Sequence, residues 1–152
     1  MFSSNFTSTS NKVLAIDMDE VLAQFITGIA KFYSSEIDNT CTITADQFHT
    51  MDFSKVWGIT EEQTNEIVRQ FYQSQIFELL QPVVGALDAL RRLKACGFEL
   101  HIVTARQHNI ETATRQWLHA HFPDDGLIAD VHFCNHCKYF FISLDLTSPD
   151  LI

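Results

Sequence analysis

Two aspartates, Asp17 and Asp19, stand two residues apart directly after the apolar run 12–16. Two carboxylates this close repel each other unless a cation or a shared proton offsets the repulsion. A divalent cation such as Mg²⁺, which prefers oxygen ligands, would offset it. One carboxylate is then available as a nucleophile and the other as a general acid and base. The spacing therefore makes Asp17 and Asp19 candidates both for catalytic residues and for metal ligands.

A second pair of polar side chains, Thr104 and Arg106, follows the alternating segment 99–104. A threonine hydroxyl at the end of a strand can donate a hydrogen bond to a phosphate oxygen, and an arginine can hold the same anion through two hydrogen bonds. Ligands bind at the carboxyl ends of parallel strands. The sequence therefore predicts that Thr104 and Arg106 bind substrate beside the two aspartates, although an Asp-x-Asp triplet alone is weak evidence.

Three short apolar segments, 12–16, 99–104 and 128–133, have the character of strands, and the first is predicted to be a buried parallel strand. A helical block separates the first two, and a further helix separates the last two. This order predicts an α/β fold with a parallel sheet and a helical insert after the first strand.

Several signals mark the expected helices. Capping boxes at Thr44-x-x-Gln47 and Thr60-x-x-Gln63 predict helix starts within a helical region from 22 to about 81. The stripe of Leu87, Leu90 and Leu93 predicts a helix that Gly97 ends. Asn109 is expected to cap the next helix, whose apolar face carries Ile110, Ala113 and Trp117.

The length of 152 residues predicts one domain with a small insert, because domains commonly hold about 100–200 residues. A hydrophobic fraction of 46% excludes a disordered chain. Ten basic against 19 acidic residues give a formal charge of −9, which disfavours a nucleic-acid polymer or an anionic membrane as partner. No apolar stretch reaches the roughly 18 residues of a membrane span. Irregular cysteine spacing and the lack of a signal-peptide pattern predict a cytoplasmic location.

With these motifs in place, the chain resembles the haloacid-dehalogenase-like (HAD) phosphohydrolase superfamily. Its first motif reads Asp-Met-Asp-Glu-Val at 17–21, and its second is Thr104 at the end of a strand. Within the superfamily the chain is most similar to the 5′(3′)-deoxyribonucleotidase-like branch, over about residues 12–136. The segments that carry this similarity are Ile-Asp-Met-Asp at 16–19, Phe-Glu-Leu-Leu-Gln-Pro-Val-Val-Gly-Ala at 77–86 and Val-Thr-Ala-Arg at 103–106.

The resemblance implies a Rossmannoid parallel sheet with a helical cap, and Mg²⁺-dependent hydrolysis of a small phosphorylated substrate. Asp17 would attack phosphorus and become an aspartyl-phosphate, and Asp19 would protonate the leaving group and then activate water. Mg²⁺ would bind the Asp17 carboxylate and the Asp19 backbone carbonyl, and Thr104 would hold a phosphate oxygen. Glu20 stands where the branch often has glycine, which leaves the shape of the following turn open.

The resemblance also implies a division of the chain. We expect a core formed by 12–23 plus 83–136, a cap at 24–82 that covers the site, and a C-terminal segment, 137–152, that is not the family's own. Before the core, the Ser-, Thr- and Asn-rich composition of 1–11 predicts a flexible tail. The aromatic residues Phe71, Tyr72 and Phe77 either line the cap pocket or hold the cap to the core.

The family requires a third motif, a lysine, and a fourth with further acids, and the residues after His136 match neither well. Lys138 is the candidate for the substrate-binding lysine. Asp145 follows too soon to be reached by a crossover, which needs about a dozen residues. We therefore expect a C-terminally truncated member whose first strand has an unpaired edge, and self-association through that edge is a hypothesis.

Two other functions stay open beside that of a phosphatase, of which a nucleotidase-like enzyme is the narrower form. One is a catalytically inactive remnant of the fold that binds a phosphate ligand or nothing. The other, more distant, is a zinc-binding interaction module built on His132, Cys134, His136 and Cys137. A single Cys-x-x-Cys with interleaved histidines is thin support for zinc, because structural sites usually use two separated ligand pairs.

Overall fold

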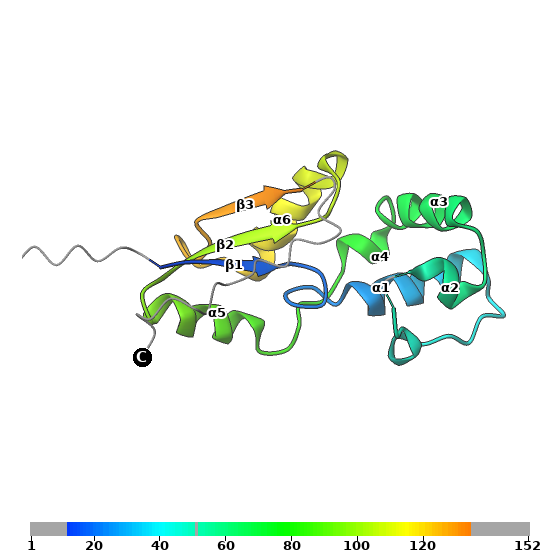
Figure 1. Cartoon of the computed structure of the whole chain (residues 1–152), viewed down its shortest axis with the longest axis horizontal. Helices are drawn as coiled ribbons and strands as arrows, with labels where there is room; N and C mark the ends of the chain where they lie inside the picture. Colours follow the sequence, from blue (N-terminus) through cyan, green and yellow to red (C-terminus); the bar gives the residue numbers. More distant parts are fainter. Residues whose placement is uncertain (1–11, 51, 135–152) are drawn as a thin grey trace, which may run out of the picture.

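The computed structural model describes residues 12–50 and 52–134, as a parallel sheet with helices beside it and a helical part beyond the carboxyl ends of its strands (Figure 1). The strands are β1 (Lys12–Asp17), β2 (Phe98–Thr104) and β3 (Asp130–Phe133). Their order in the sheet is β1-β2-β3, and both neighbouring pairs are parallel. The predicted α/β fold with a parallel sheet is confirmed.

The outer position of β1 changes its burial from the prediction. Ile16 is buried, whereas Val13 is 59% exposed and Lys12 is also exposed, so the expectation of a buried first strand was wrong for most of its length. The physical reason is the strand order, because among the described residues β1 pairs with β2 alone. The central strand β2 instead buries Leu100, Ile102 and Thr104. Self-association through the open edge of β1 stays a prediction.

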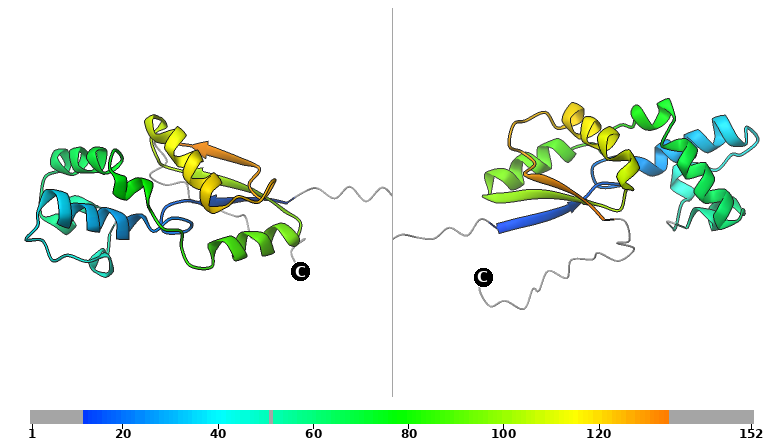
Figure 2. Two further views of the ribbon diagram at one scale, coloured as in Figure 1. Left: turned by 180° about the vertical axis from the view of Figure 1, so that it is seen from behind. Right: turned by 90° about the horizontal axis from the view of Figure 1, so that it is seen from above.

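The two core helices are α5 (Ala86–Ala95) and α6 (Glu111–His121), and they lie on the same side of the sheet (Figure 2). Two right-handed crossovers that move in one direction across a sheet place their helices on one face. Gly97, with a φ of 87°, follows the end of α5 as predicted. The Asn109 cap was wrong, because Asn109 lies inside a 3₁₀ turn, η3 (His108–Ile110), that runs directly into α6.

The helical part contains several short elements after α1 (Phe25–Phe32), which continues into a π-helix, η1 (Tyr33–Ile37). They are η2 (Ala45–Gln47), α2 (Phe53–Trp57), α3 (Glu61–Phe71) and α4 (Gln75–Glu78). Residues 38–44 are not helical, so the predicted helical region is interrupted.

The Thr60 capping box forms as predicted. The Gln63 N–H donates to Thr60 Oγ1 at 3.2 Å, and the Thr60 N–H donates to Gln63 Oε1 at 3.0 Å. At Thr44 the backbone N–H donates to Gln47 Oε1 at 2.9 Å, but the element that follows is one 3₁₀ turn.

The chain leaves and re-enters the sheet region at one crossing point. Ala23 and Pro82 form an antiparallel bridge, the Gln24 N–H donates to the Gln81 carbonyl at 3.0 Å, and the Val83 N–H donates to the Leu22 carbonyl at 2.8 Å. This point coincides with the boundary expected for a cap at 24–82. We retain the division into a core and a cap as a proposal.

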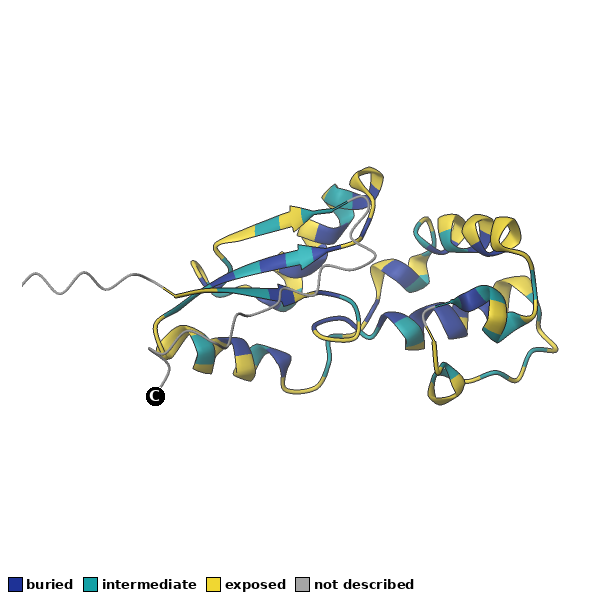
Figure 3. Cartoon of the chain, viewed as in Figure 1, coloured by how far each residue is buried: buried dark blue, intermediate teal, exposed yellow. Residues whose placement is uncertain are grey.

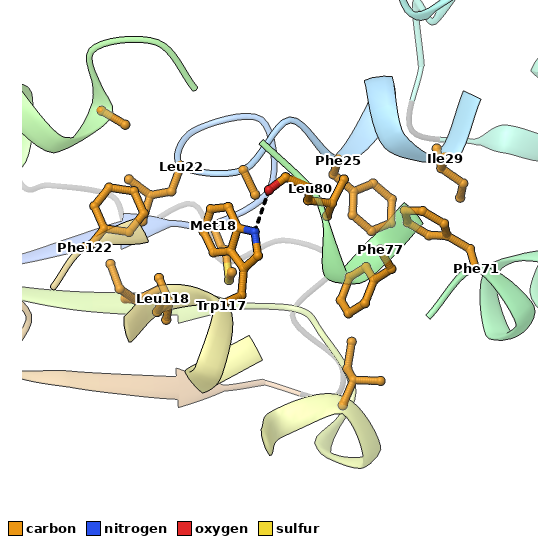
Figure 4. Packing of buried hydrophobic residues seen from close by; sticks show 14 of the residues in the cluster. Met18, Leu22, Phe25, Ile29, Phe71, Phe77, Leu80, Trp117, Leu118 and Phe122 are labelled. Carbon is orange, nitrogen blue, oxygen red and sulfur yellow. Dashed lines mark hydrogen bonds between the residues drawn. The ribbon is translucent and has the colours of Figure 1, made fainter. Parts of the chain in front are cut away.

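A single hydrophobic cluster extends from the sheet into the helical part (Figures 3 and 4). At the junction, Trp117 Nε1 donates to the Leu80 carbonyl at 2.8 Å. On α1, Gly28 permits a close approach, because a Cβ there would overlap Leu80 Cδ2 and lie 3.2 Å from Phe71 Cζ. The helical part and the sheet therefore share one set of packing contacts.

Candidate active site

The carboxyl ends of β1 and β2 bring together the residues singled out in the sequence. Asp17 is the last residue of β1 and lies opposite Val103 in the register, one residue before Thr104. Asp19 follows in the turn after β1, and its carboxylate is paired with Arg106. The predicted meeting of the two motifs at one edge of the sheet is thus observed.

Asp17 is an exposed residue, but its carboxyl group is partly surrounded by protein, and its Oδ1 accepts a hydrogen bond from the Met18 N–H at 2.7 Å. Partial burial raises the pKa of Asp17 above its ordinary value, and the negative charge of Asp19 raises it further. The Met18 hydrogen bond and the positive charge of Arg106 act in the opposite direction and do not cancel the rise. A cation beside Asp17 would relieve both desolvation and repulsion, so this donor set fits Mg²⁺.

Mg²⁺ commonly keeps several waters and takes one or two carboxylates from the protein. Within the described ranges, no group of three His, Cys, Asp or Glu side chains gathers as a metal site. The two aspartates and their backbone are therefore what this part of the chain offers to such an ion.

The turn after Asp19 depends on Glu20, which adopts a left-handed backbone with a φ of 62°. The Leu22 and Ala23 N–H groups donate to the Met18 carbonyl at 2.8 and 3.0 Å, and the Glu20 N–H donates to the Ala23 carbonyl at 2.8 Å. The Glu20 side chain accepts from the Ile26 N–H at 2.6 Å, at the start of α1. Glutamate thus takes the conformation that favours glycine and supplies a cap that glycine lacks.

We expect Glu20→Ala to lower the free energy of unfolding by about 1 kcal/mol, because it removes a helix-capping contact. Glu20→Gly removes the same contact but relieves the left-handed backbone, so it should be more stable than the alanine variant by about 1 kcal/mol. Urea unfolding followed by circular dichroism measures both. Equal midpoints for the two variants would contradict a left-handed residue 20.

Arg106 lies with Asp19 rather than open to a ligand, and its side chain is 1% exposed. Its Nη2 donates to Asp19 Oδ1 at 2.6 Å, and its Nε lies 3.1 and 3.2 Å from the two carboxylate oxygens. Its Nη1 donates to Thr114 Oγ1 at 3.3 Å. The predicted contact of Arg106 with a phosphate stays a prediction, and the structure shows its guanidinium engaged elsewhere.

Thr104 is 1% exposed, and its Oγ1 accepts a hydrogen bond from the Arg106 N–H at 3.2 Å. A hydroxyl that accepts one bond still carries its own proton for donation.

Lys138 lies outside the described residues, as do His136 and Cys137 of the zinc hypothesis. Of the remaining two, His132 Nε2 lies 2.8 Å from His101 Nδ1 on the neighbouring strand.

All three aromatic residues pack in or against the hydrophobic cluster, so the lining of a cap pocket stays a prediction. Phe71 and Phe77 are buried in the hydrophobic cluster and hold the helical part together. Burial raises the pKa of Tyr72 to about 12. The charge of Asp19 adds to this rise, and the charge of Arg106 opposes it. Tyr72 is therefore a neutral phenol close enough to the two charged side chains to feel both.

Sequence reasoning missed two residues that contact Arg106. Phe25 on α1 lies with its ring centroid 6.0 Å from Arg106 Cζ. Thr114 is fully buried on α6, on the same face as Ile110 and Trp117. A polar residue on that apolar face was the signal available for Thr114.

No helix within 12–50 or 52–134 has the length and apolar character to cross a bilayer.

Comparisons with known proteins agree with this geometry. A model of the family described as 5′ nucleotidase, deoxy (pyrimidine), cytosolic type C protein matches residues 11–138. A comparison with curated proteins returns no match.

Solved structures share the fold. A Bacteroides fragilis protein assigned as a haloacid dehalogenase-like hydrolase is similar at 24% identity and a TM-score of 0.57, over 80% of this chain and 62% of that one. A Clostridium acetobutylicum protein assigned as a phosphatase has 16% identity and a TM-score of 0.57, over 80% and 60%. A HAD family hydrolase from Deinococcus radiodurans R1, with bound phosphate and sodium, has 16% identity and a TM-score of 0.54, over 81% and 57%.

The chain thus spans between 57% and 62% of the length of these three structures. At such identities the likeness concerns the fold, and it confirms the predicted HAD-like α/β architecture with its helical insert.

Proposed function

The chain belongs to the 5′ nucleotidase, deoxy (pyrimidine), cytosolic type C protein family, and from this premise we propose that it hydrolyses a small phosphate monoester. The substrate class that we propose is a nucleoside monophosphate. The observation that carries the proposal is the placement of Asp17 and Asp19 beside Thr104 at the carboxyl ends of β1 and β2. Ligands of parallel α/β sheets bind at this edge.

The proposed reaction begins with Asp17, whose free carboxylate oxygen attacks phosphorus to form an aspartyl-phosphate. Asp19 gives a proton to the departing ester oxygen and later removes one from the water that hydrolyses the intermediate. The Thr104 hydroxyl donates to a phosphate oxygen.

The Asp17 carboxylate and the Asp19 backbone carbonyl would hold Mg²⁺, which supplies charge neutralisation at the phosphate when bound. Lys138 is retained as a further candidate for binding the phosphate.

The cap at 24–82 completes the proposal, because it covers this edge of the sheet and limits the access of water to the site. Tyr72 belongs to this cap, and we propose that it contributes to substrate choice, because the charges of Asp19 and Arg106 both act on its phenol. We also propose a cytoplasmic location, with which the free cysteines Cys41, Cys96 and Cys134 are consistent.

Removal of divalent metal should reduce phosphate release at least about a hundredfold, because the charge on the phosphate then has no counter-ion at Asp17. The measurement is inorganic phosphate released from a panel of nucleoside monophosphates, with EDTA and after Mg²⁺ is restored. Circular dichroism under both conditions establishes that the protein stays folded.

Restored activity with Mg²⁺ supports the proposed function. A folded protein that binds inorganic phosphate without turnover in either condition contradicts it and favours the inactive form of the fold. Stoichiometric zinc that is lost when Cys134 and Cys137 are replaced would favour the zinc-binding module instead.

A further inference from the structure

The most heavily buried charge in the described part of the chain belongs to Arg106, and its surroundings define what it can do. Its Nε and Nη2 face the Asp19 carboxylate, and its Nη1 faces Thr114 on α6. The ring of Phe77 lies with its centroid 5.0 Å from Arg106 Cζ, and the ring of Phe25 lies at 6.0 Å. All three guanidinium nitrogens donate hydrogen bonds within the protein, and two aromatic rings lie beside the group. The guanidinium is therefore directed at Asp19 rather than at a ligand.

We propose that Arg106 is a positioning residue for Asp19, and that it fixes the direction in which Asp19 transfers a proton to the leaving group. This inference rests on the proposed function. A planar guanidinium that donates from two nitrogens to one carboxylate restricts both its position and its rotation, which a single-point ammonium does not. The Asp19 side chain is 20% exposed, so the carboxylate is held by Arg106 while part of it faces the site.

The step that depends on this positioning is the departure of the ester oxygen. The bond between phosphorus and that oxygen breaks while a bond forms between phosphorus and the Asp17 carboxylate. In the proposed step Asp19 transfers a proton to the departing oxygen, and its carboxylate then stays paired with Arg106. Proton transfer of this kind contributes about 10²- to 10⁴-fold and requires hydrogen-bond distance, so a small displacement of Asp19 removes most of it.

Arg106 is held from both parts of the molecule. Its backbone N–H donates to Thr104 and its guanidinium to Thr114, both in the sheet-and-helix core. Phe25 is on α1 and Phe77 on α4, both in the 24–82 segment. The orientation of the Asp19 carboxylate therefore depends on how the cap packs against Arg106 as well as on the core.

The test compares two substrates that differ in their need for a proton. A nucleoside monophosphate releases an alkoxide that requires protonation, whereas p-nitrophenyl phosphate releases a stable phenolate. The quantity to measure is kcat/KM, which covers the steps up to departure of the leaving group. We expect Arg106→Lys to lower it about a hundredfold or more for the nucleotide and less than about fivefold for p-nitrophenyl phosphate.

Two further variants keep the test decisive. Thr114→Val removes one partner of the guanidinium and leaves the ion pair, so it should cause the same selective loss at about three- to tenfold. Arg91→Lys is the matched control, because Arg91 forms a comparable two-nitrogen pair with Asp124 on an exposed surface, at 2.6 and 3.0 Å. Arg91→Lys should change kcat/KM by no more than about twofold for either substrate.

Equal losses on both substrates, or no loss on either, would overturn the positioning role. Equal losses that arise from a higher KM would assign Arg106 to phosphate binding instead. Failure of both Arg106→Lys and Thr114→Val to fold would show a structural role alone, which also overturns the inference. Wild-type protein that releases phosphate from neither substrate would overturn the proposed function itself, a result distinct from all of these.

Discussion

Asp17→Asn is expected to abolish phosphate release, with a loss of turnover on the order of a thousandfold or more, as for other enzymes that lose their nucleophile. An amide oxygen is a far weaker nucleophile than a carboxylate, and it is also a poorer ligand for Mg²⁺. The variant retains the acceptor for the Met18 N–H, so the end of β1 should keep its geometry. Initial rates of phosphate release with saturating Mg²⁺ provide the measurement.

The control for this loss is Asp88→Asn, a matched change on α5, where the side chain is 76% exposed and its nearest ion-pair partner is Arg91 at 3.7 Å. It should retain the wild-type rate. Comparable activity in Asp17→Asn and the wild type would exclude the aspartyl-phosphate route.

A measurement of stability shows whether Asp17→Asn loses activity through its chemistry or because the protein is unfolded. The pKa of Asp17 is raised in the folded state, chiefly by burial, so the folded protein binds this proton more tightly than the unfolded chain does. Stability therefore falls as pH rises from about 4 through the raised pKa, and at neutral pH the charged side chain is a net cost. In metal-free buffer, Asp17→Asn should unfold at a slightly higher urea concentration than the wild type at pH 7, and this advantage should vanish in acid.

The elements with strong local signals could be predicted from the sequence. The three strands and their parallel order follow from apolar runs separated by helical segments. The Thr60 capping box and the helix end at Gly97 follow from hydrogen-bonding and backbone preferences that span a few residues. The positions of Asp17, Asp19 and Thr104 could be predicted for the same reason, because each lies at or just after the end of a recognisable strand.

The features that sequence could not supply depend on contacts between distant residues. The Arg106–Asp19 pair joins positions 87 residues apart, and no local pattern distinguishes it from a pair of residues that both face a ligand. The exposure of β1 follows from its outer place in the sheet; the composition of residues 12–16 does not encode that place, which only the expected unpaired edge of the first strand indicated. At Asn109 a strong capping residue was overridden by a 3₁₀ turn that leads straight into α6.

The largest loss of stability is expected from Phe71→Ala, at about 3–5 kcal/mol, because the ring is fully buried and its removal leaves a cavity. Its centroid lies 5.3 Å from that of Phe25 and 5.4 Å from that of Phe77, in edge-to-face arrangements. A cost of this size is a large part of the total stability of a small protein. Urea unfolding measures it, with Leu79→Ala, at a side chain that is 63% exposed, as the control.

The two tryptophans make this substitution a test of how the cap and core unfold. Trp57 is on α2 and Trp117 is on α6, so Trp57→Phe and Trp117→Phe backgrounds leave one fluorescent reporter in each part. Because the buried side chains form one cluster across the junction, Phe71→Ala should lower the midpoint equally for both reporters. A midpoint that falls for Trp57 alone would show that the cap unfolds independently, and that its packing is separable from the residues that hold Asp19 in place.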